Sequence, residues 1–231
     1  MKILVIIPAY NEADNIVRVV EEIRRETPQY DYIVINDGSR DDTAARCREH
    51  GYMLLDLSAN LGLTGAVQTG MRYALESGYD AVVQIDGDGQ HDPRYIPVME
   101  AMMAEQNLDL VIGSRFLEGK RPRTLRNIGN ELLDKVILMT TGQRITDATS
   151  GMRLYGNRVL KALAADQYFS PEPDTVAWLI RRGAKVAECP VVMRERTAGE
   201  SYLNPWKSMK YMGHMLVSIL LIQWFRKRGE L

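Results

Sequence analysis

Two aspartates, Asp86 and Asp88, flank a glycine directly after the apolar run at residues 82–85. Carboxylate oxygens are hard ligands that suit Mg²⁺ or Mn²⁺, and residues two apart face the same side of a continued strand. An EF-hand calcium loop is excluded, because counting from Asp86 puts His91 where that loop needs glycine and Pro97 where it needs glutamate. The pattern favours a metal site at the end of a strand over a solvated acidic turn.

Other nucleotide- and phosphate-binding motifs are missing. No G-x-G-x-x-G follows the first apolar run, and no Walker lysine motif is present, so a dinucleotide site and a P-loop are not expected. A haloacid-dehalogenase phosphatase is disfavoured, because the fifth residue of the run that starts at Asp86 is Gln90 rather than threonine or valine.

Apolar periodicity predicts the elements that position these acids. Expected strands and helices alternate along the first half of the chain, with strands at 2–10, 30–39, 52–58, 79–86 and 108–116 and helices at 11–26, 41–51, 63–78 and 96–105. Such alternation indicates β-α-β units and a parallel sheet, whose ligands bind beyond the carboxyl ends of the strands. The polar residues that follow the strands therefore gather on one rim: Pro8 to Glu12, Asp37 to Ser39, Asp86 to Gln90 and Gly113 to Arg115.

The composition fits a globular protein of 231 residues, with 45% hydrophobic and 26% charged residues. The net charge of −1 gives no signal for nucleic-acid binding, and we expect no nucleic-acid partner. Two cysteines, Cys47 and Cys189, lie far apart in no motif, which favours a reducing, cytoplasmic compartment. We find neither a signal-peptide pattern nor an uninterrupted apolar stretch long enough to span a membrane.

Six motifs carry a resemblance to a known family: PAYNE (8–12), NDGS (36–39), NLGLTGAVQTG (60–70), DGDGQHDP (86–93), GSRF (113–116) and SGMRLY (150–155). Their order and spacing are similar to those of family 2 glycosyltransferases, within these the polyprenyl-phosphate sugar synthases of the dolichol-phosphate mannosyltransferase type. The resemblance implies the GT-A fold, an α/β fold with a mostly parallel central sheet flanked by helices. One departure is Leu63, which stands where a lysine is common in the family.

The resemblance also implies roles for the residues of the rim. Asp86, Asp88 and Gln90 would surround the metal, Mg²⁺ or Mn²⁺, and the diphosphate. Pro8, Tyr10, Glu12 and Asp37 would contact the nucleotide; the lesser alternatives are that Asp37 closes a turn and that Glu12 favours a helix N-terminus. His91 is expected either to touch the diphosphate or to make a structural hydrogen bond.

Arginines are the expected ligands of the acceptor phosphate, because their planar forks match phosphate oxygens. The resemblance implies Arg115 and a second arginine on the next helix, with Arg126 as the best match and Arg121 and Arg123 as rivals. Asp147 precedes the SGMRLY motif and Arg153 lies within it, and we assign Arg153 to the acceptor phosphate. Asp147 could act as a base towards a hydroxyl acceptor, whereas an ionised phosphate needs none and would leave Asp147 an orienting or turn role.

The C-terminal part differs in charge and hydropathy from the rest. Residues 181–231 hold ten Lys or Arg and four Glu, and residues 211–225 are largely apolar between Trp206 and Trp224. We expect a glycosyltransferase domain at 1–204 and an amphipathic helical tail at 205–231. The tail would lie on the cytoplasmic face of a membrane or bind a small membrane protein. Packing on the domain, or a homo-oligomer interface, is the alternative.

Together these observations predict inverting, metal-dependent transfer of a sugar from a nucleotide sugar to a polyprenyl phosphate, with UDP expected ahead of GDP. Two alternatives stay open at this point. One is transfer to a hydroxyl of a glycan or another acceptor. The other is a non-catalytic subunit that binds a nucleotide sugar.

Overall fold

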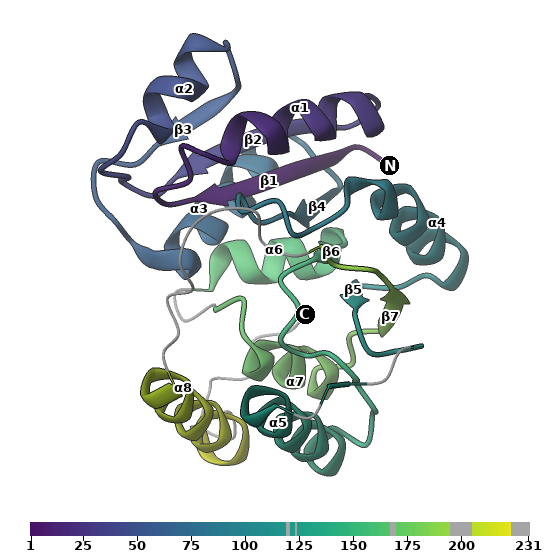
Figure 1. Cartoon of the computed structure of the whole chain (residues 1–231). Coiled ribbons are helices and arrows are strands. Elements are labelled where there is room, and N and C mark those ends of the chain that lie inside the picture. Colours follow the sequence, from purple (N-terminus) through teal and green to yellow (C-terminus); the bar gives the residue numbers. More distant parts are fainter. Residues whose placement is uncertain (119–120, 123, 167–169, 195–204, 223–231) are drawn as a thin grey trace.

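The computed structural model describes residues 1–118, 121–122, 124–166, 170–194 and 205–222. It gives the backbone but not the side chains of Leu125, Arg126, residues 205–209 and Ile222. A seven-stranded sheet forms the centre of the molecule, in the order β3-β2-β1-β4-β6-β5-β7 (Figure 1). The strands are β1 Ile3–Ala9, β2 Asp31–Asn36, β3 Leu54–Asp56, β4 Ala81–Gln84, β5 Leu110–Ser114, β6 Arg153–Tyr155 and β7 Val186–Pro190.

Helices cover both faces of this sheet. They are α1 Ile16–Glu26, α2 Thr43–Glu49, α3 Gly62–Glu76, the 3₁₀ turn η1 Pro93–Tyr95, α4 Ile96–Gln106, α5 Leu125–Thr141, α6 Asn157–Ala165, α7 Pro173–Arg181, α8 Pro205–Val217 and the π-helical turn η2 Ser218–Ile222. The core on one face is made with α1, α2 and α4, and the core on the other with α3 and α5 to α8. The layers follow from the alternation of side chains along β1, where Leu4 and Ile6 join one core and Val5 and Ile7 the other.

The predicted α/β architecture is confirmed, with one strand that breaks the parallel pattern. β1, β2, β3 and β4 are parallel to one another where they pair, and β5 is parallel to β7. β6 lies antiparallel between β4 and β5, so that Arg153 pairs with Gln84 on one side and Ile112 on the other. The segment before β6, residues 146–152, therefore arrives at the rim between the ends of β4 and β5.

The predicted elements are mostly longer than the observed ones. The first helix begins at Ile16 rather than at residue 11, because the chain after β1 first makes a turn in which Asn11 adopts a left-handed φ of 55°. β4 ends at Gln84, two residues before the expected end at Asp86, and does not continue to Asp88. A turn carries Asp86 and Asp88 instead, and the argument that both face one side of a strand does not apply.

The C-terminal helix packs on the domain. Met215 and Ile219 are buried in the same core as Leu133 and Ile137 of α5. The boundary predicted between residues 204 and 205 stays a prediction, since residues 195–204 lie outside the described part of the chain, as do residues 223–231. Within the described part, no helix has the length and hydropathy needed to cross a membrane.

Candidate active site

The acidic turn after β4 is held by its neighbours in the sequence. Gln84 Nε2 donates to Asp86 Oδ1 at 3.0 Å, and the backbone N–H of Asp86 donates to His91 Nδ1 at 3.0 Å. His91 is buried, so it takes the structural one of its two expected roles. The Asp86 side chain keeps 34% of its exposure, which leaves its carboxylate accessible at the rim.

The end of β1 lies against this turn. The backbone N–H of Gly87 donates to the carbonyl of Pro8 at 3.2 Å, and a Cβ at Gly87 would stand 3.1 Å from that oxygen. The same Cβ would stand 3.3 Å from Cβ of Ala9 and in ordinary contact, at 3.5 Å, with Cγ of Glu12, so a side chain at this position would crowd the end of β1. The structure thus brings Pro8 and Glu12 beside the acidic turn, as expected of rim residues.

A glycine from a distant part of the chain also approaches the turn. A Cβ at Gly151, in the SGMRLY motif, would lie 2.6 Å from Asp86 Oδ2 and 3.2 Å from Cε1 of His91. Real Cβ atoms do not make contacts this short with a carboxylate oxygen. A side chain at Gly151 would therefore have to displace the Asp86 carboxylate, which gives the glycine of this motif a physical reason.

Asp88 and Gln90 form the far side of the turn. Asp88 Oδ1 accepts the backbone N–H of Gln90 at 3.0 Å. The side-chain amide of Gln90 donates to the carbonyl of Arg194 at 3.2 Å, and the carbonyl of Gln90 accepts the N–H of Arg194. This amide is directed to the chain after β7, which does not favour Gln90 as a metal ligand.

The carboxylates of Asp86 and Asp88 suit a divalent cation whose remaining coordination positions are filled by the substrate and water. Mg²⁺ commonly binds proteins through one or two carboxylates and takes its other ligands from water and substrate phosphates. Within the described residues, no group of three or more His, Cys, Asp or Glu is placed to enclose a metal. Asp86 and Asp88 lie in one turn at an open rim, so they could supply the one or two carboxylates of such a site, with further oxygen ligands from a substrate diphosphate.

Arg115 is fixed by a carboxylate behind it. Its Nε and Nη2 donate to the two oxygens of Asp147, both at 2.7 Å, and Nη2 also donates to Thr149 Oγ1 at 3.2 Å. Burial opposes the charge of the guanidinium, but the hydrogen bond and charge of Asp147 outweigh it and raise the pKa of Arg115. Asp147 is fully buried. It therefore orients a permanently charged Arg115 and is not placed to act as a base.

Glu188 of β7 anchors Asp147 in turn. Glu188 Oε1 accepts the N–H of Asp147 at 2.8 Å and the hydroxyl of Thr146 at 3.0 Å, and Oε2 accepts the N–H of Thr146 at 2.8 Å. Sequence reasoning missed Glu188. Its only signal was a single acidic residue inside an otherwise apolar strand, and nothing in the sequence pairs that strand with residues 146 and 147.

Arg153 lies inside the protein, which corrects its assignment to the acceptor phosphate. It is 1% exposed, and its guanidinium donates to the carbonyls of Ala148 at 2.7 Å and Ser150 at 2.9 Å. In this position a lipid phosphate does not reach it. Arg153 instead ties the 146–152 segment to β6.

The other two residues expected to contact the nucleotide, Asp37 and Tyr10, lie at the rim after β2 and β1. Asp37 is 3% exposed, and its Oδ1 accepts the N–H of Leu61 at 2.7 Å, just before α3. Burial raises the pKa of this carboxyl, while the N–H groups of Leu61 and Gly62 oppose the shift. Here Asp37 braces the start of α3 instead of closing a turn within its own loop, and its contact with a nucleotide stays a prediction. Tyr10 is half-buried at the end of β1.

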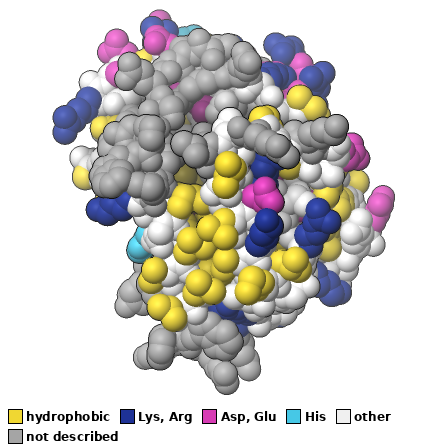
Figure 2. Space-filling model, turned by 60° about the horizontal axis from the view of Figure 1, so that its bottom comes forward, with side chains coloured by type: hydrophobic (Ala, Val, Ile, Leu, Met, Phe, Trp, Pro, Cys, Tyr) yellow, Lys and Arg dark blue, Asp and Glu magenta, His cyan; other side chains and the backbone are white. Residues whose placement is uncertain are grey.

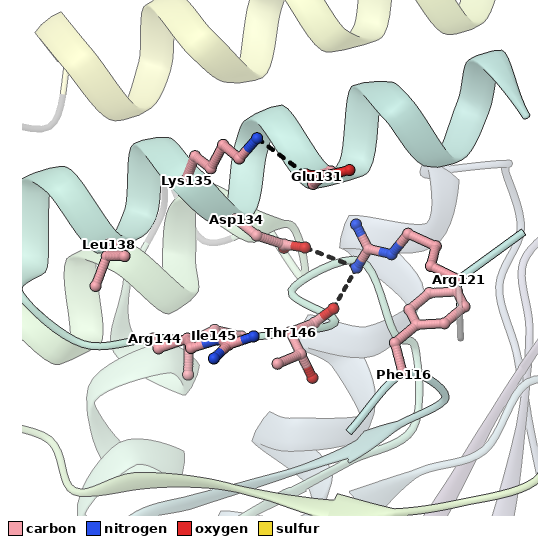
Figure 3. Close-up of a pocket in the computed structure, with 9 residues that line it drawn as sticks. All are labelled: Phe116, Arg121, Glu131, Asp134, Lys135, Leu138, Arg144, Ile145 and Thr146. Atoms are coloured by element: carbon pink, nitrogen blue, oxygen red, sulfur yellow. Dashed lines mark hydrogen bonds and ion pairs between the residues drawn. The ribbon is translucent and has the colours of Figure 1, made fainter. Parts of the chain in front are cut away.

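A pocket of about 390 Å³ opens between α5 and the loop after β5, lined among others by Phe116 and Thr146, the sequence neighbours of Arg115 and Asp147 (Figure 3). Arg121 points into the pocket. Its Nη2 donates to Asp134 of α5 at 2.7 Å and to the carbonyl of Thr146. Burial raises the pKa of Asp134 to about 6, although Arg121 opposes the shift. Arg121 therefore anchors the loop after β5. Arg126 lies in the first turn of α5, and its side chain is outside the described part, as is Arg123.

Comparisons with known proteins agree with this geometry. Residues 4–164 match the family model described as glycosyl transferase family 2. The chain is 31% identical over 219 residues to an undecaprenyl-phosphate mannosyltransferase of Micrococcus luteus, covering 88% of each protein. It is 30% identical over 215 residues to a polyprenol monophosphomannose synthase of Mycolicibacterium smegmatis, covering 87% of this chain and 80% of that protein.

The fold also matches solved structures. A glucosyl-3-phosphoglycerate synthase of Mycobacterium tuberculosis, solved with Mn²⁺, UDP and its product, superposes with a TM-score of 0.65 at 18% identity. The match covers 99% of this chain and 81% of that protein. At this identity the likeness establishes the fold, and it does not extend to ligands.

Proposed function

The chain belongs to glycosyl transferase family 2, and from this premise we propose that it transfers a sugar from a nucleotide sugar to the phosphate of a polyprenyl lipid. Membership of this family makes it a glycosyltransferase rather than a non-catalytic binding subunit. The names of the two relatives, both of which join mannose to a polyprenyl phosphate, support the acceptor class and make mannose the first sugar to test.

One observation carries the proposal. The 146–152 segment links the two halves of the rim, because Asp147 holds Arg115 at the end of β5 while Gly151 passes against Asp86 at the end of β4. The carboxylates proposed for the donor side and the arginine proposed for the acceptor side are thus fixed by one piece of backbone. A donor diphosphate at Asp86 and Asp88 and an acceptor anion at Arg115 would meet between them.

The chemistry follows from the charges of these groups. An oxygen of the acceptor phosphate attacks the anomeric carbon in line, the bond from that carbon to the diphosphate oxygen breaks, and the configuration inverts. The acceptor is already ionised, so the step needs no base, and the pairing of Asp147 with Arg115 favours this acceptor over a hydroxyl. Arg115 would hold the acceptor phosphate. A divalent cation at Asp86 and Asp88 would neutralise the charge left on the departing diphosphate.

The proposal includes the location of the enzyme, its donor nucleotide and its oligomeric state. A polyprenyl chain partitions into a bilayer, so we place the enzyme at the cytoplasmic surface of a membrane, associated peripherally. A UDP-sugar is still expected ahead of a GDP-sugar. A homo-oligomer through the C-terminal helix stays a prediction.

The decisive experiment measures release of the nucleoside diphosphate with polyprenyl phosphate, Mg²⁺ or Mn²⁺, and a panel of UDP- and GDP-sugars. Asp88→Asn should lower turnover by about 100-fold or more, because the charge on the leaving group is no longer neutralised. The matched control is Asp80→Asn, an exposed aspartate at the opposite end of the same strand. Full activity in EDTA, or in Asp88→Asn, would exclude the metal, and a product that retains the donor's anomeric configuration would exclude inversion.

A further inference from the structure

Two packed helices leave large apolar side chains in solvent on one side of the molecule. The apolar face, as we define it, consists of Ile128, Leu132 and Met139 of α5 and Val217, Leu220 and Leu221 at the end of α8 and in η2. These side chains are between 43% and 82% exposed. Figure 2 shows apolar side chains gathered in one patch on the face that carries α5 and α8. Continuous apolar patches on a soluble surface commonly mark interaction sites.

The apolar face is a fixed feature of the fold. Met215 and Ile219 bury the inner side of this helical segment in the core. Ser218 Oγ donates to Asp174 of α7 at 2.6 Å, and Arg181 Nη2 donates to the carbonyl of Ile219 at 3.2 Å. The inner surface of α8 and η2 is therefore already packed against, and hydrogen-bonded to, the rest of the domain. The outward side chains have no such partner among the described residues.

The apolar face adjoins the proposed acceptor side. Lys135, which is 65% exposed and pairs with Glu131 at 2.9 Å, stands between Leu132 and Met139 on the surface of α5. Both Lys135 and Glu131 also line the pocket that contains Arg121 (Figure 3). One helix thus borders the pocket that contains Arg121 and carries half of the apolar face, and Lys135 belongs to both surfaces.

Exposed cations share the two helices of the apolar face. Lys135 lies on α5 and Lys210 on α8, and both are exposed. The sequence from residue 205 onward contains five Lys or Arg, namely Lys207, Lys210, Arg226, Lys227 and Arg228, and only one acidic residue, Glu230. Apolar side chains with basic neighbours are the combination that binds a bilayer surface containing anionic lipids.

We propose that the apolar face docks the enzyme on the surface of an anionic bilayer, with α5 and α8 lying in the interface. The inference rests on the proposed function, because a lipid phosphate is presented at that surface and Arg115 must reach it. It adds to that function by assigning half of the docking surface to α5, a helix inside the glycosyltransferase domain. Docking on α5 sets the loop after β5, which begins at Arg115, next to the lipid head groups.

A second copy of the chain is the competing occupant. A symmetric dimer would bury the same surface on both subunits and bring their Lys135 and Lys210 side chains towards like charges. An anionic bilayer attracts the same cations. The charge pattern therefore favours the bilayer, and the oligomeric state enters the test as an outcome.

The test uses the full chain and a double variant, Met139→Glu with Leu221→Glu, at two well-exposed positions of the apolar face. The matched control is Val98→Glu with Met53→Glu, at exposed apolar positions outside the face. We measure flotation with vesicles of phosphatidylcholine containing about one-third phosphatidylglycerol. Wild type and control should float, and the face variant should bind about 100-fold more weakly, since two apolar anchors are lost and two repelled charges gained.

A second measurement separates this inference from the proposed function. Transfer to a short-chain, water-soluble prenyl phosphate should be equal in all three proteins, whereas transfer to long-chain polyprenyl phosphate in vesicles should fall only in the face variant. If wild type does not float, or the face variant floats equally well, the docking assignment is wrong. If neither protein floats, and wild type is a dimer whereas the face variant is a monomer, then the apolar face binds a second copy of the chain. Absence of transfer to any acceptor refutes the proposed function and leaves the flotation result standing.

Discussion

Replacing Glu188 with glutamine tests whether β7 positions the proposed acceptor arginine. Glu188 Oε1 accepts two hydrogen bonds and Oε2 one, from donors on Thr146 and Asp147. Glutamine keeps the shape but turns one acceptor into an NH₂ group. In either orientation of the amide, at least one backbone N–H then faces another donor at about hydrogen-bonding distance.

The expected magnitude follows from that unpaired donor. A half-buried N–H without an acceptor costs about 1–3 kcal/mol. If between half and all of this energy is lost from the transition state through displacement of Asp147 and Arg115, kcat/KM for the acceptor falls by about 2- to 140-fold, since about 1.4 kcal/mol is tenfold. The melting temperature should fall by roughly 3–10 °C for a chain of this length.

The assay separates positioning from general damage. We would measure kcat/KM for polyprenyl phosphate at saturating donor, and the Kd of the nucleotide sugar by calorimetry. The donor Kd should stay within about twofold, because Glu188 contacts the acceptor side through Asp147 and Arg115. The matched control is Glu21→Gln on α1, a glutamate that accepts a hydrogen bond from Tyr52 at 2.8 Å but contacts no rim residue.

A double-mutant cycle gives the refuting result. Glu188→Gln in an Arg115→Ala background should cost little further activity if Glu188 acts through Arg115. Fully additive effects would mean that the two residues act independently. Unchanged kcat/KM for the acceptor in a destabilised Glu188→Gln protein would make Glu188 a purely structural residue.

Three further predictions follow from the geometry. Gly151→Ala places a methyl group 2.6 Å from Asp86 Oδ2. The Mn²⁺ concentration for half-maximal activity should therefore rise by about tenfold or more. The control Gly213→Ala, with open space at its Cβ, should leave that concentration unchanged. Asp134 has a folded pKa of about 6, above its usual 3.8, so its protonation stabilises the fold. The free energy of unfolding in denaturant should therefore fall by about 2 kcal/mol more from pH 4.5 to 7 in wild type than in Asp134→Asn, and equal pH dependence would refute the burial argument. Gly38→Ala puts a Cβ 2.7 Å from the backbone of Ala59 and Asn60 at a φ of 63°, so the protein should melt several degrees lower by calorimetry without a change in acceptor KM.

The sequence by itself determined the elements and the rim. Alternating apolar runs are a local property, so the strands at β1, β2, β4 and β5 and the intervening helices were predicted with boundaries that are a few residues too long. Because parallel strands end at one edge, the polar residues after them could be assigned to one rim without knowing the fold. The motifs around Asp86, Arg115 and Gly151 were sufficient to indicate the family.

Only the tertiary structure decided which of these residues face the rim and what supports them. The antiparallel insertion of β6 buries Arg153 and carries residues 146–152 to Asp86 and Arg115, a contact between segments that are more than 30 positions apart in the chain. Glu188 lies 41 residues after Asp147 and was not recognised, because a hydrogen bond between distant segments leaves no periodic signal in either. The hydropathy of the tail indicated an interface helix. Its packing on α5 was decided by long-range contacts through Met215 and Ile219, which also leave the outward apolar side chains exposed.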